Sequence, residues 1–216
     1  MKVAPSILAA DFCNLAEEIR RVGVAGADLL HLDVMDGVFV PNLTFGPPIV
    51  EAINRMTDME LDAHLMIVRP ERYVPQFLDA GADWLSFHAE ATEKVDECIA
   101  VIKGRNKNAG LALSPPTPFK YIQQYMDKLD YILVMTVNPG FYGQQFIETV
   151  LKKVVEIKTW ITQHGLTCLI EVDGGINSST VGKLCDVGVD IIVAGAGIFK
   201  HNDYKEAIEE LRCSKA

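Results

Sequence analysis

Five histidine and aspartate side chains interrupt apolar segments of the sequence near the C-terminal ends of those segments. They are His31, Asp33, Asp62, His64 and Asp173. A single histidine in a strand is more often a hydrogen-bonded core residue, and a single aspartate often caps the next helix. Several such residues at three segment ends instead favour one shared site. Imidazole and carboxylate groups together suit Zn, Fe, Mn or Co and leave coordination positions for a substrate. Two histidines and two aspartates that converge here therefore predict a divalent metal site.

The elements that must position these side chains alternate along the whole sequence, short apolar segments with longer amphipathic ones. The expected strands are residues 3–8, 29–34, 60–66, 84–88, 109–113, 131–136, 168–172 and 191–194. The expected helices are residues 14–24, 47–56, 73–80, 93–103, 121–126, 146–164, 180–187 and 204–211. Strands that alternate with helices pair in parallel through crossover connections.

A recurrent joint between helix and strand indicates how the strands are arranged. Gly26-Ala27-Asp28, Gly81-Ala82-Asp83 and Gly188-Val189-Asp190 each precede an expected strand, and Asp130 holds the matching place without a glycine. Glycine ends a helix well because it tolerates the left-handed conformation. Joints before the second, fourth, sixth and eighth strands predict an α/β fold, a single (β/α)8 TIM barrel, for which about 200 residues are enough. The alternative is an open doubly wound sheet of the same elements.

The second and seventh strands lie nearly opposite each other in an eight-strand ring, so Asp33 and Asp173 can flank a small ligand from two faces. One carboxylate can remove a proton from a carbon while the other delivers a proton to the far side, which inverts the centre. A metal ion on the adjacent oxygens would stabilise the enediolate between these two steps. The arrangement therefore predicts a proton transfer that uses two carboxylates.

Three glycine-rich turns follow the last three expected strands, at residues 138–145, 173–177 and 194–199. Backbone amides near glycine and at a helix N-terminus bind phosphate, and TIM barrels often hold a phosphate after their last two strands. None of the three turns contains Lys or Arg, so the amides would carry most of the binding; the first turn also has the composition of a mobile lid. Three methionines at strand ends either fill the core or form a water-excluding collar around the reacting carbon: Met35, Met66 and Met135.

Composition excludes several classes of protein. The chain has 216 residues, 49% of them hydrophobic and 23% charged, with a formal net charge of −9. These proportions predict one globular domain over residues 1–216. An acidic chain is a poor binder of nucleic acid or of an anionic membrane, and no apolar run approaches the roughly 20 residues that span a bilayer. Five scattered cysteines without a CxxC motif predict reduced thiols and a cytoplasmic location.

Several motifs in this order resemble those of the ribulose-phosphate 3-epimerase family. They lie at residues 4–8, 31–37 with 39–42, 64–66, 137–141 with 143–144, and 171–176. The resemblance covers essentially the whole chain. It implies a TIM barrel of the phosphate-binding type that interconverts D-ribulose 5-phosphate and D-xylulose 5-phosphate in the pentose phosphate pathway.

The resemblance also implies roles for individual residues. It makes His31, Asp33, His64 and Asp173 the ligands of one divalent ion per subunit, with zinc favoured, and makes Asp33 the proton acceptor and Asp173 the proton donor. The substrate-binding residues that it implies are Ser6, His64, Gly140, Phe141, Tyr142, Gly143, Asp173, Gly174, Gly175, Gly195 and Ala196. Because family members form dimers or hexamers, it also implies a homo-oligomer.

Other functions compete with this one. An epimerase for a six-carbon ketose phosphate, such as allulose 6-phosphate, would use the same groups on a longer substrate. Orotidine-phosphate decarboxylase and hexulose-phosphate synthase use an Asp-x-Lys pattern on the third strand, where this chain has Asp62-Ala63-His64, and the missing lysine counts against both. A non-catalytic sugar-phosphate sensor would not need both Asp33 and Asp173.

Overall fold

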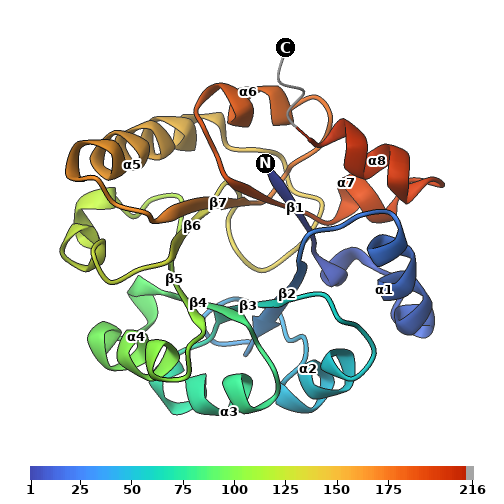
Figure 1. Cartoon of the computed structure of the whole chain (residues 1–216), viewed down its shortest axis with the longest axis horizontal. Coiled ribbons are helices and arrows are strands. Elements are labelled where there is room, and N and C mark those ends of the chain that lie inside the picture. The colour runs from blue at the N-terminus through green and yellow to red at the C-terminus, as the bar shows by residue number, and fades with distance from the viewer. Residues whose placement is uncertain (213–216) are drawn as a thin grey trace.

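Eight parallel strands form one sheet in a computed structural model that describes residues 1–212. The strands are β1 (Lys2–Pro5), β2 (Leu30–Met35), β3 (Leu61–Met66), β4 (Trp84–His88), β5 (Asn108–Leu113), β6 (Tyr131–Met135), β7 (Leu169–Asp173) and β8 (Ile191–Ala194). Their order is β1-β8-β7-β6-β5-β4-β3-β2, and a parallel bridge between Ser6 and His31 connects the two ends. The ring in Figure 1 is the predicted TIM barrel. An open doubly wound sheet is excluded, because its strand order would reverse partway across the sheet.

Helices surround this ring, as Figure 1 shows. They are α1 (Leu15–Val24), α2 (Pro47–Asn54), α3 (Val74–Asp79), α4 (Val95–Gly104), α5 (Leu151–His164), α6 (Val181–Asp186), α7 (Ala196–Phe199) and α8 (Tyr204–Glu210). Their apolar residues recur at helical spacing and are buried against the strands, for example Ile19 and Val22 of α1 and Val154 and Ile157 of α5.

The helix predicted at residues 121–126 is wrong. The segment instead contains two 3₁₀ turns, Phe119–Tyr121 and Gln123–Tyr125. Phe119 and Ile122 are both buried, and the three-residue period of a 3₁₀ turn places both on the same side. A short amphipathic pattern could not separate this turn from an α-helix.

The helix predicted at residues 146–164 starts later than expected. A 3₁₀ turn covers Glu148–Val150, and α5 begins at Leu151. The Ile147 amide donates a hydrogen bond to the Thr136 carbonyl at 2.8 Å, which holds this part of the chain against the end of β6. A tertiary hydrogen bond therefore decides where the helix can begin.

The four predicted joints form one repeated hydrogen-bond pattern. A carboxylate oxygen of each joint aspartate accepts from a backbone amide near the start of the preceding odd-numbered strand, at 2.8 to 3.0 Å. The backbone amide of the same aspartate donates back to the carbonyl of that residue. The pairs are Asp28 with Val3, Asp83 with Leu61, Asp130 with Ala109 and Asp190 with Ile170. The joints therefore connect neighbouring strands at the N-terminal end of the barrel.

Alternate residues of a strand belong to two different apolar layers. In β8, Ile191 and Val193 belong to the cluster inside the barrel, whereas Ile192 and Ala194 belong to the larger layer beneath the helices. This division follows the two-residue period of a strand. Polar side chains inside the barrel are fully buried as well: His31, Asp62, Ser86 and Glu171.

The cysteines follow the sequence prediction only in part. Cys13, Cys98 and Cys168 are free thiols, and burial raises the pKa of Cys98 and of Cys168 to about 12. Cys185 is disulfide-bonded, so the prediction of reduced thiols is wrong for that residue, because spacing along the chain does not show which sulfur atoms meet. The prediction for Cys213 lies outside the described residues. Within residues 1–212, none of the helices has the length and apolar character needed to cross a bilayer.

Asp130 provides a test of the joints. The Asp130→Ala variant leaves the buried Ala109 amide without its carboxylate partner, so we expect the free energy of unfolding to fall by about 1–3 kcal/mol. Urea unfolding followed by circular dichroism measures this change. Asp127→Ala, at an exposed position in the same connection, is the control and should change stability by less than about 0.5 kcal/mol. Equal losses in both variants would contradict the role of the joint.

Candidate functional site

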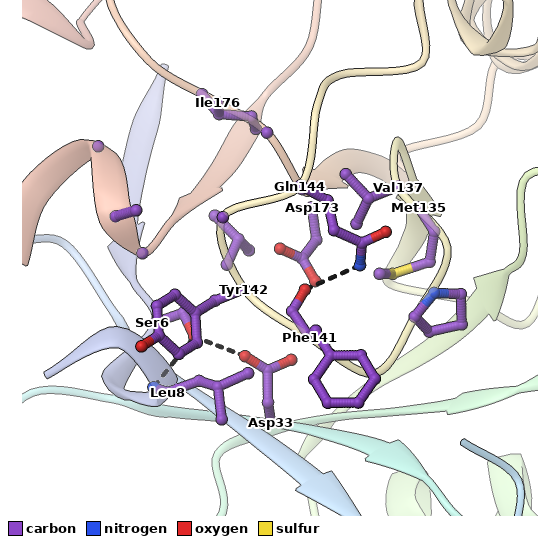
Figure 2. A pocket seen from close by; sticks show the side chains of 18 of the residues that line it. Ser6, Leu8, Asp33, Met135, Val137, Phe141, Tyr142, Gln144, Asp173 and Ile176 are labelled. Carbon is purple, nitrogen blue, oxygen red and sulfur yellow. Dashed lines mark hydrogen bonds between the residues drawn. The ribbon is translucent and has the colours of Figure 1, made fainter. Parts of the chain in front are cut away.

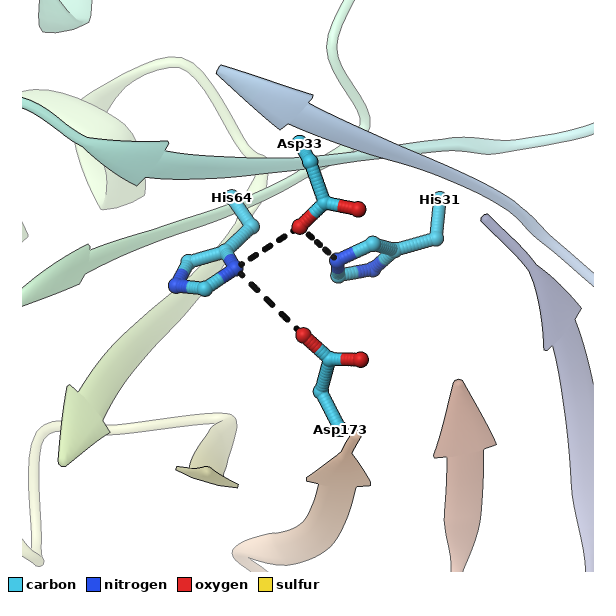
Figure 3. A group of neighbouring side chains, drawn as sticks. All are labelled: His31, Asp33, His64 and Asp173. Atoms are coloured by element: carbon cyan, nitrogen blue, oxygen red, sulfur yellow. Dashed lines mark hydrogen bonds and ion pairs between the residues drawn. The ribbon is translucent and has the colours of Figure 1, made fainter. Parts of the chain in front are cut away.

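Four side chains from three strands meet at the C-terminal ends of the barrel strands (Figure 3). His31 and Asp33 lie on β2, His64 lies on β3, and Asp173 ends β7. One possible ligand atom of each residue lies within 4.8 Å of those of the other three. His31 Nε2 and His64 Nδ1 are each 3.4 Å from Asp33 Oδ1, and His64 Nδ1 is 3.9 Å from Asp173 Oδ2. The structure thus brings together the four ligands that the resemblance implies.

The donor atoms of this group fit a divalent metal ion. Burial lowers the pKa of His64 to about 4, so its imidazole is neutral and can offer a lone pair. His31 Nε2 is buried and has no hydrogen-bond partner among residues 1–212. Burial lowers the pKa of His31, but the Asp62 and Asp33 carboxylates more than offset this and raise it well above its usual value. A metal ion would replace the proton on Nε2, as metal binding to histidine generally does.

The two carboxylates of the group differ in their affinity for a proton. Burial opposes ionisation of Asp33, but the charge of His31 outweighs it and holds the pKa of Asp33 far below its usual range. Burial, together with the negative charge of Asp33, raises the pKa of Asp173 to about 8. In the metal-free protein at neutral pH, Asp33 is therefore a carboxylate and Asp173 a carboxylic acid. A pair whose environments separate its pKa values in this way can act as a base and an acid.

A second buried group lies on the other side of the His31 ring, and the sequence analysis assigned it no role of its own. Asp62 Oδ2 is 2.5 Å from His31 Nδ1, and the Tyr131 hydroxyl donates to Asp62 Oδ1 at 3.0 Å. Neither carboxylate oxygen of Glu171 has a hydrogen-bond partner within the described residues. Burial raises the pKa of Glu171 well above its usual value. A signal was present in the sequence, because both acidic residues interrupt otherwise apolar strands.

A cavity of about 320 Å³ opens at this end of the barrel (Figure 2). Asp33 and Asp173 line it from two sides, and every implied substrate-binding residue lines it except His64. The three methionines Met35, Met66 and Met135 also line it. They are buried, so they form apolar wall next to the carboxylates. This placement suits the collar described above.

Ser6 holds one of the two carboxylates in place. Its hydroxyl donates to Asp33 Oδ2 at 2.5 Å and accepts a hydrogen bond from the Leu8 amide at 3.3 Å, as the dashed lines in Figure 2 show. Ser6 comes directly after β1, the strand that closes the ring next to β2. Asp33 therefore has fixed partners on both of its oxygens, because His31 and His64 face Oδ1.

The glycine-rich turn after β7 packs too closely against the segment after β6 for any side chain. Gly174 and Gly175 have φ values of 117° and 68°, in the left-handed region that favours glycine. A β-carbon on Gly174 would lie 2.4 Å from the Val137 side chain, and one on Gly175 would lie 2.7 Å from the Phe146 amide nitrogen. The backbone therefore borders the cavity directly at this point.

Lys200 and His201 also line the cavity, and the sequence analysis did not include them. Both are exposed, and both follow α7, the short helix that begins after Gly195. The third glycine-rich turn ends one residue before Lys200, so the sequence did place a cation beside it. Positive charge at the mouth of the cavity would attract an anionic ligand toward the turns.

The segment between β6 and α5 is held by two polar side chains. Gln144 Nε2 donates to the carbonyl oxygens of Asn138 and Phe141, at 2.6 and 2.8 Å. Asn42 Nδ2, from the connection after β2, donates to the Gly140 carbonyl at 2.8 Å. Phe141 and the adjacent Tyr142 are more than half exposed. The segment thus covers part of the cavity, and its motion as a lid stays a prediction.

Comparisons with known proteins show which family of proteins this chain is similar to. A profile described as the ribulose-phosphate 3 epimerase family matches residues 2–199. A ribulose-phosphate 3-epimerase of Bacillus subtilis is 50% identical over the full length of both chains. One of Escherichia coli K12 is 45% identical, with 99% of this chain and 96% of that protein covered. Among solved structures, 3-hexulose-6-phosphate synthase from Salmonella typhimurium has a TM-score of 0.71 at 18% identity, covering 98% of this chain and 96% of its own, which shows the shared fold alone.

The raised pKa of Asp173 gives a prediction for the metal-free protein. The usual pKa of an aspartate is 3.8, so the folded state binds this proton more tightly than the unfolded state does. The tighter binding stabilises the folded state fully below about pH 4, and this stabilisation is lost as the pH rises through 8. Asp173→Asn mimics the protonated side chain. We expect this variant to exceed the wild type in stability by about 1 kcal/mol or more at pH 9, and by much less at pH 4.

Urea unfolding in the presence of a chelator measures both differences. Asp58→Asn, at an exposed position, is the control for the change in net charge. A difference for Asp173→Asn that is the same at pH 4 and pH 9 would show that folding does not perturb this carboxyl group.

Proposed function

This chain belongs to the ribulose-phosphate 3-epimerase family, and we propose that it interconverts D-ribulose 5-phosphate and D-xylulose 5-phosphate by moving a proton at C3. One observation carries the proposal: the carboxyl groups of Asp33 and Asp173 line the same cavity from two strands that lie across the ring. The names of the relatives favour the five-carbon substrate over a six-carbon one. The absence of lysine at residue 64 disfavours decarboxylation.

In the forward direction the Asp33 carboxylate takes the proton from C3. The electron pair of the broken C3–H bond passes into the C2–C3 bond, and the π electrons of the C2 carbonyl move to its oxygen, which gives an enediolate. Asp173 then gives its proton to the opposite face of C3, so the configuration inverts. Asp33 ends protonated and Asp173 ends ionised, which is the state that the reverse reaction requires. Exchange of one proton between the two carboxyl groups, directly or through solvent, restores the starting state.

His31, Asp33, His64 and Asp173 would hold the divalent ion, which we propose to be zinc, with iron, manganese and cobalt as the alternatives. When bound, the ion would supply positive charge beside the C2 and C3 oxygens and so stabilise the enediolate. A carboxylate beside a cation is a weaker base. Asp33 accepts from Ser6 at Oδ2 and faces the two histidines with Oδ1. Oδ1 can therefore bind the ion while Oδ2 takes the proton.

The substrate phosphate would bind at the backbone of the turns after β6, β7 and β8. Gly140, Gly143, Gly174, Gly175 and Gly195 line that part of the cavity, and Lys200 adds a positive charge at its mouth. Ser6 would bind the sugar hydroxyl next to Asp33. Phe141 and Tyr142 would exclude water once the segment closes.

We also propose a cytoplasmic location and a homo-oligomeric state, a dimer or a hexamer. The location is supported by the free thiols of Cys13, Cys98 and Cys168, and the oligomeric state by the family resemblance. Size-exclusion chromatography with light scattering determines the second directly.

Isotope exchange can distinguish the role of Asp33 from that of Asp173. In deuterium oxide, Asp173→Asn should still exchange the C3 hydrogen of D-ribulose 5-phosphate through Asp33, yet epimerise it at least about 100-fold more slowly, because no acid serves the opposite face. Asp33→Asn should do the reverse and exchange only the C3 hydrogen of D-xylulose 5-phosphate. Proton NMR of the two sugars follows both processes.

Asp58→Asn is the control for this experiment and should behave as the wild type does. If either aspartate variant kept near-normal epimerisation, that residue would not be the essential acid or base.

Removal of the metal should lower turnover by roughly 100-fold or more, because charge on the enediolate would lose its stabilisation. Addition of Zn²⁺, Mn²⁺, Co²⁺ or Fe²⁺ should restore turnover. Turnover is measured after exhaustive chelation, and elemental analysis checks the metal content. Full activity in a sample free of metal would remove the ion from the mechanism and leave the two carboxyl groups as the only catalysts.

A further inference from the structure

The His64 ring has a partner on each of its two nitrogens. Nδ1 faces Asp33 and Asp173, at 3.4 and 3.9 Å. Nε2 is 3.0 Å from Nε2 of His88, which ends β4. Both imidazoles are fully buried. Water therefore does not compete for either nitrogen, and the hydrogen bond between the two rings decides which nitrogen of His64 carries a hydrogen.

His88 is bonded in turn to an acidic side chain. His88 Nδ1 is 3.2 Å from Glu90 Oε2 and 3.3 Å from the Ser114 hydroxyl. A carboxylate can only accept, so His88 Nδ1 must donate. The His88 tautomer with its hydrogen on Nδ1 offers a lone pair at Nε2, and against that lone pair His64 Nε2 is the donor between the two rings. The remaining lone pair of His64 lies on Nδ1, which points into the candidate metal site.

Glu90 is itself fixed by the loop after β5. Its Oε1 accepts from the Ser114 amide at 2.9 Å and from the Thr117 hydroxyl. Burial opposes ionisation of Glu90, but these bonds and His88 lower its pKa to about 2. Lys153 of α5 donates to the Ser114 carbonyl at 2.8 Å and so holds the loop. The chain of contacts therefore runs from an outer helix to the metal-facing ring.

In His31 the other ring nitrogen, Nδ1, carries the hydrogen. Its Nδ1 is 2.5 Å from Asp62, which also accepts from the Tyr131 hydroxyl, so Nδ1 is the donor and Nε2 faces Asp33. The two rings thus offer different nitrogens to the same site. A carboxylate fixes the tautomer of the first ring directly, and a histidine and a carboxylate together fix that of the second. Such partners of metal-binding histidines orient the ring and make it a better ligand.

We propose that His88 and Glu90 are positioning residues, which hold His64 as the Nε2–H tautomer so that Nδ1 binds the metal, while Asp62 holds His31 as the Nδ1–H tautomer. The proposal rests on the metal site of the proposed function. It assigns no contact with the sugar to His88 or Glu90, so the effect of replacing them is expected on metal affinity and on the state of His64.

The zinc-loaded wild-type protein gives the direct test. Long-range ¹H–¹⁵N NMR spectra of protein labelled at histidine show which ring nitrogen carries hydrogen. The protein has five histidines, and single His→Gln variants assign their signals. We expect hydrogen on Nε2 of His64 and on Nδ1 of His31. Hydrogen on Nδ1 of His64 would overturn the proposal, as would a doubly protonated His88.

Zinc affinity of variants gives the second test, by competition with a chromophoric chelator. His88→Leu removes the acceptor for His64 and should weaken zinc binding by about 10- to 100-fold. His88→Gln can still accept at its amide oxygen, so its dissociation constant should stay within about threefold of wild type. Glu90→Gln should fall between the two. His164→Leu, at the exposed end of α5, is the control and should not change the affinity.

These outcomes separate the two proposals. If wild-type protein binds no zinc, the metal site is wrong and this inference fails with it. If wild type binds zinc and a folded His88→Leu variant binds it equally well, the metal site stands and the positioning role is wrong. If His88→Leu does not fold, the tautomers of the wild type decide the question without it.

Discussion

Two carboxyl groups in one buried site cannot both be charged unless a cation lies between them. Asp33 and Asp173 meet this constraint in two ways. In the metal-free protein, His31 supplies positive charge to Asp33, and Asp173 keeps its proton up to a pKa of about 8. With a divalent ion in the group, the same four side chains would neutralise it. Both states depend on a ring that places the ends of β2 and β7 across one cavity.

The two ends of the barrel divide the tasks of stability and chemistry. At the N-terminal end, the four joint aspartates bond to backbone amides of the neighbouring strands and so fix the positions of the strands. Toward the C-terminal end, carboxylates and imidazoles are buried, and neither carboxylate oxygen of Glu171 has a hydrogen-bond partner among the residues that the structure describes. Buried polar groups of this kind destabilise a fold unless they are paired. The joints at the other end help to offset that cost.

Most buried polar side chains around the site are oriented by a second polar side chain. Ser6 orients Asp33, Asp62 orients His31, and His88 faces His64. Each partner comes from a strand next to that of the residue it contacts, because the parallel register brings equivalent positions together: Ser6 opposite His31, His31 opposite Asp62, and Asp33 opposite His64. A one-residue shift in register would turn these side chains to the other face of the sheet.

The sequence by itself determined the barrel, the strand ends that carry the polar residues and the glycine-rich turns, because these depend on local periodicity and on residue type. It could not determine the start of α5, which depends on a hydrogen bond to the end of β6, or the bonding of Cys185, which spacing along the chain does not show. It also could not determine the turns at residues 119–125, because a short amphipathic pattern fits an α-helix as well. The contacts of His88 and Glu90 likewise depend on β3 and on the loop after β5. Only the closed ring decided that Asp33 and Asp173 line one cavity and that their pKa values shift in opposite directions, because these values depend on burial and on the distance between charges, which are properties of the folded chain.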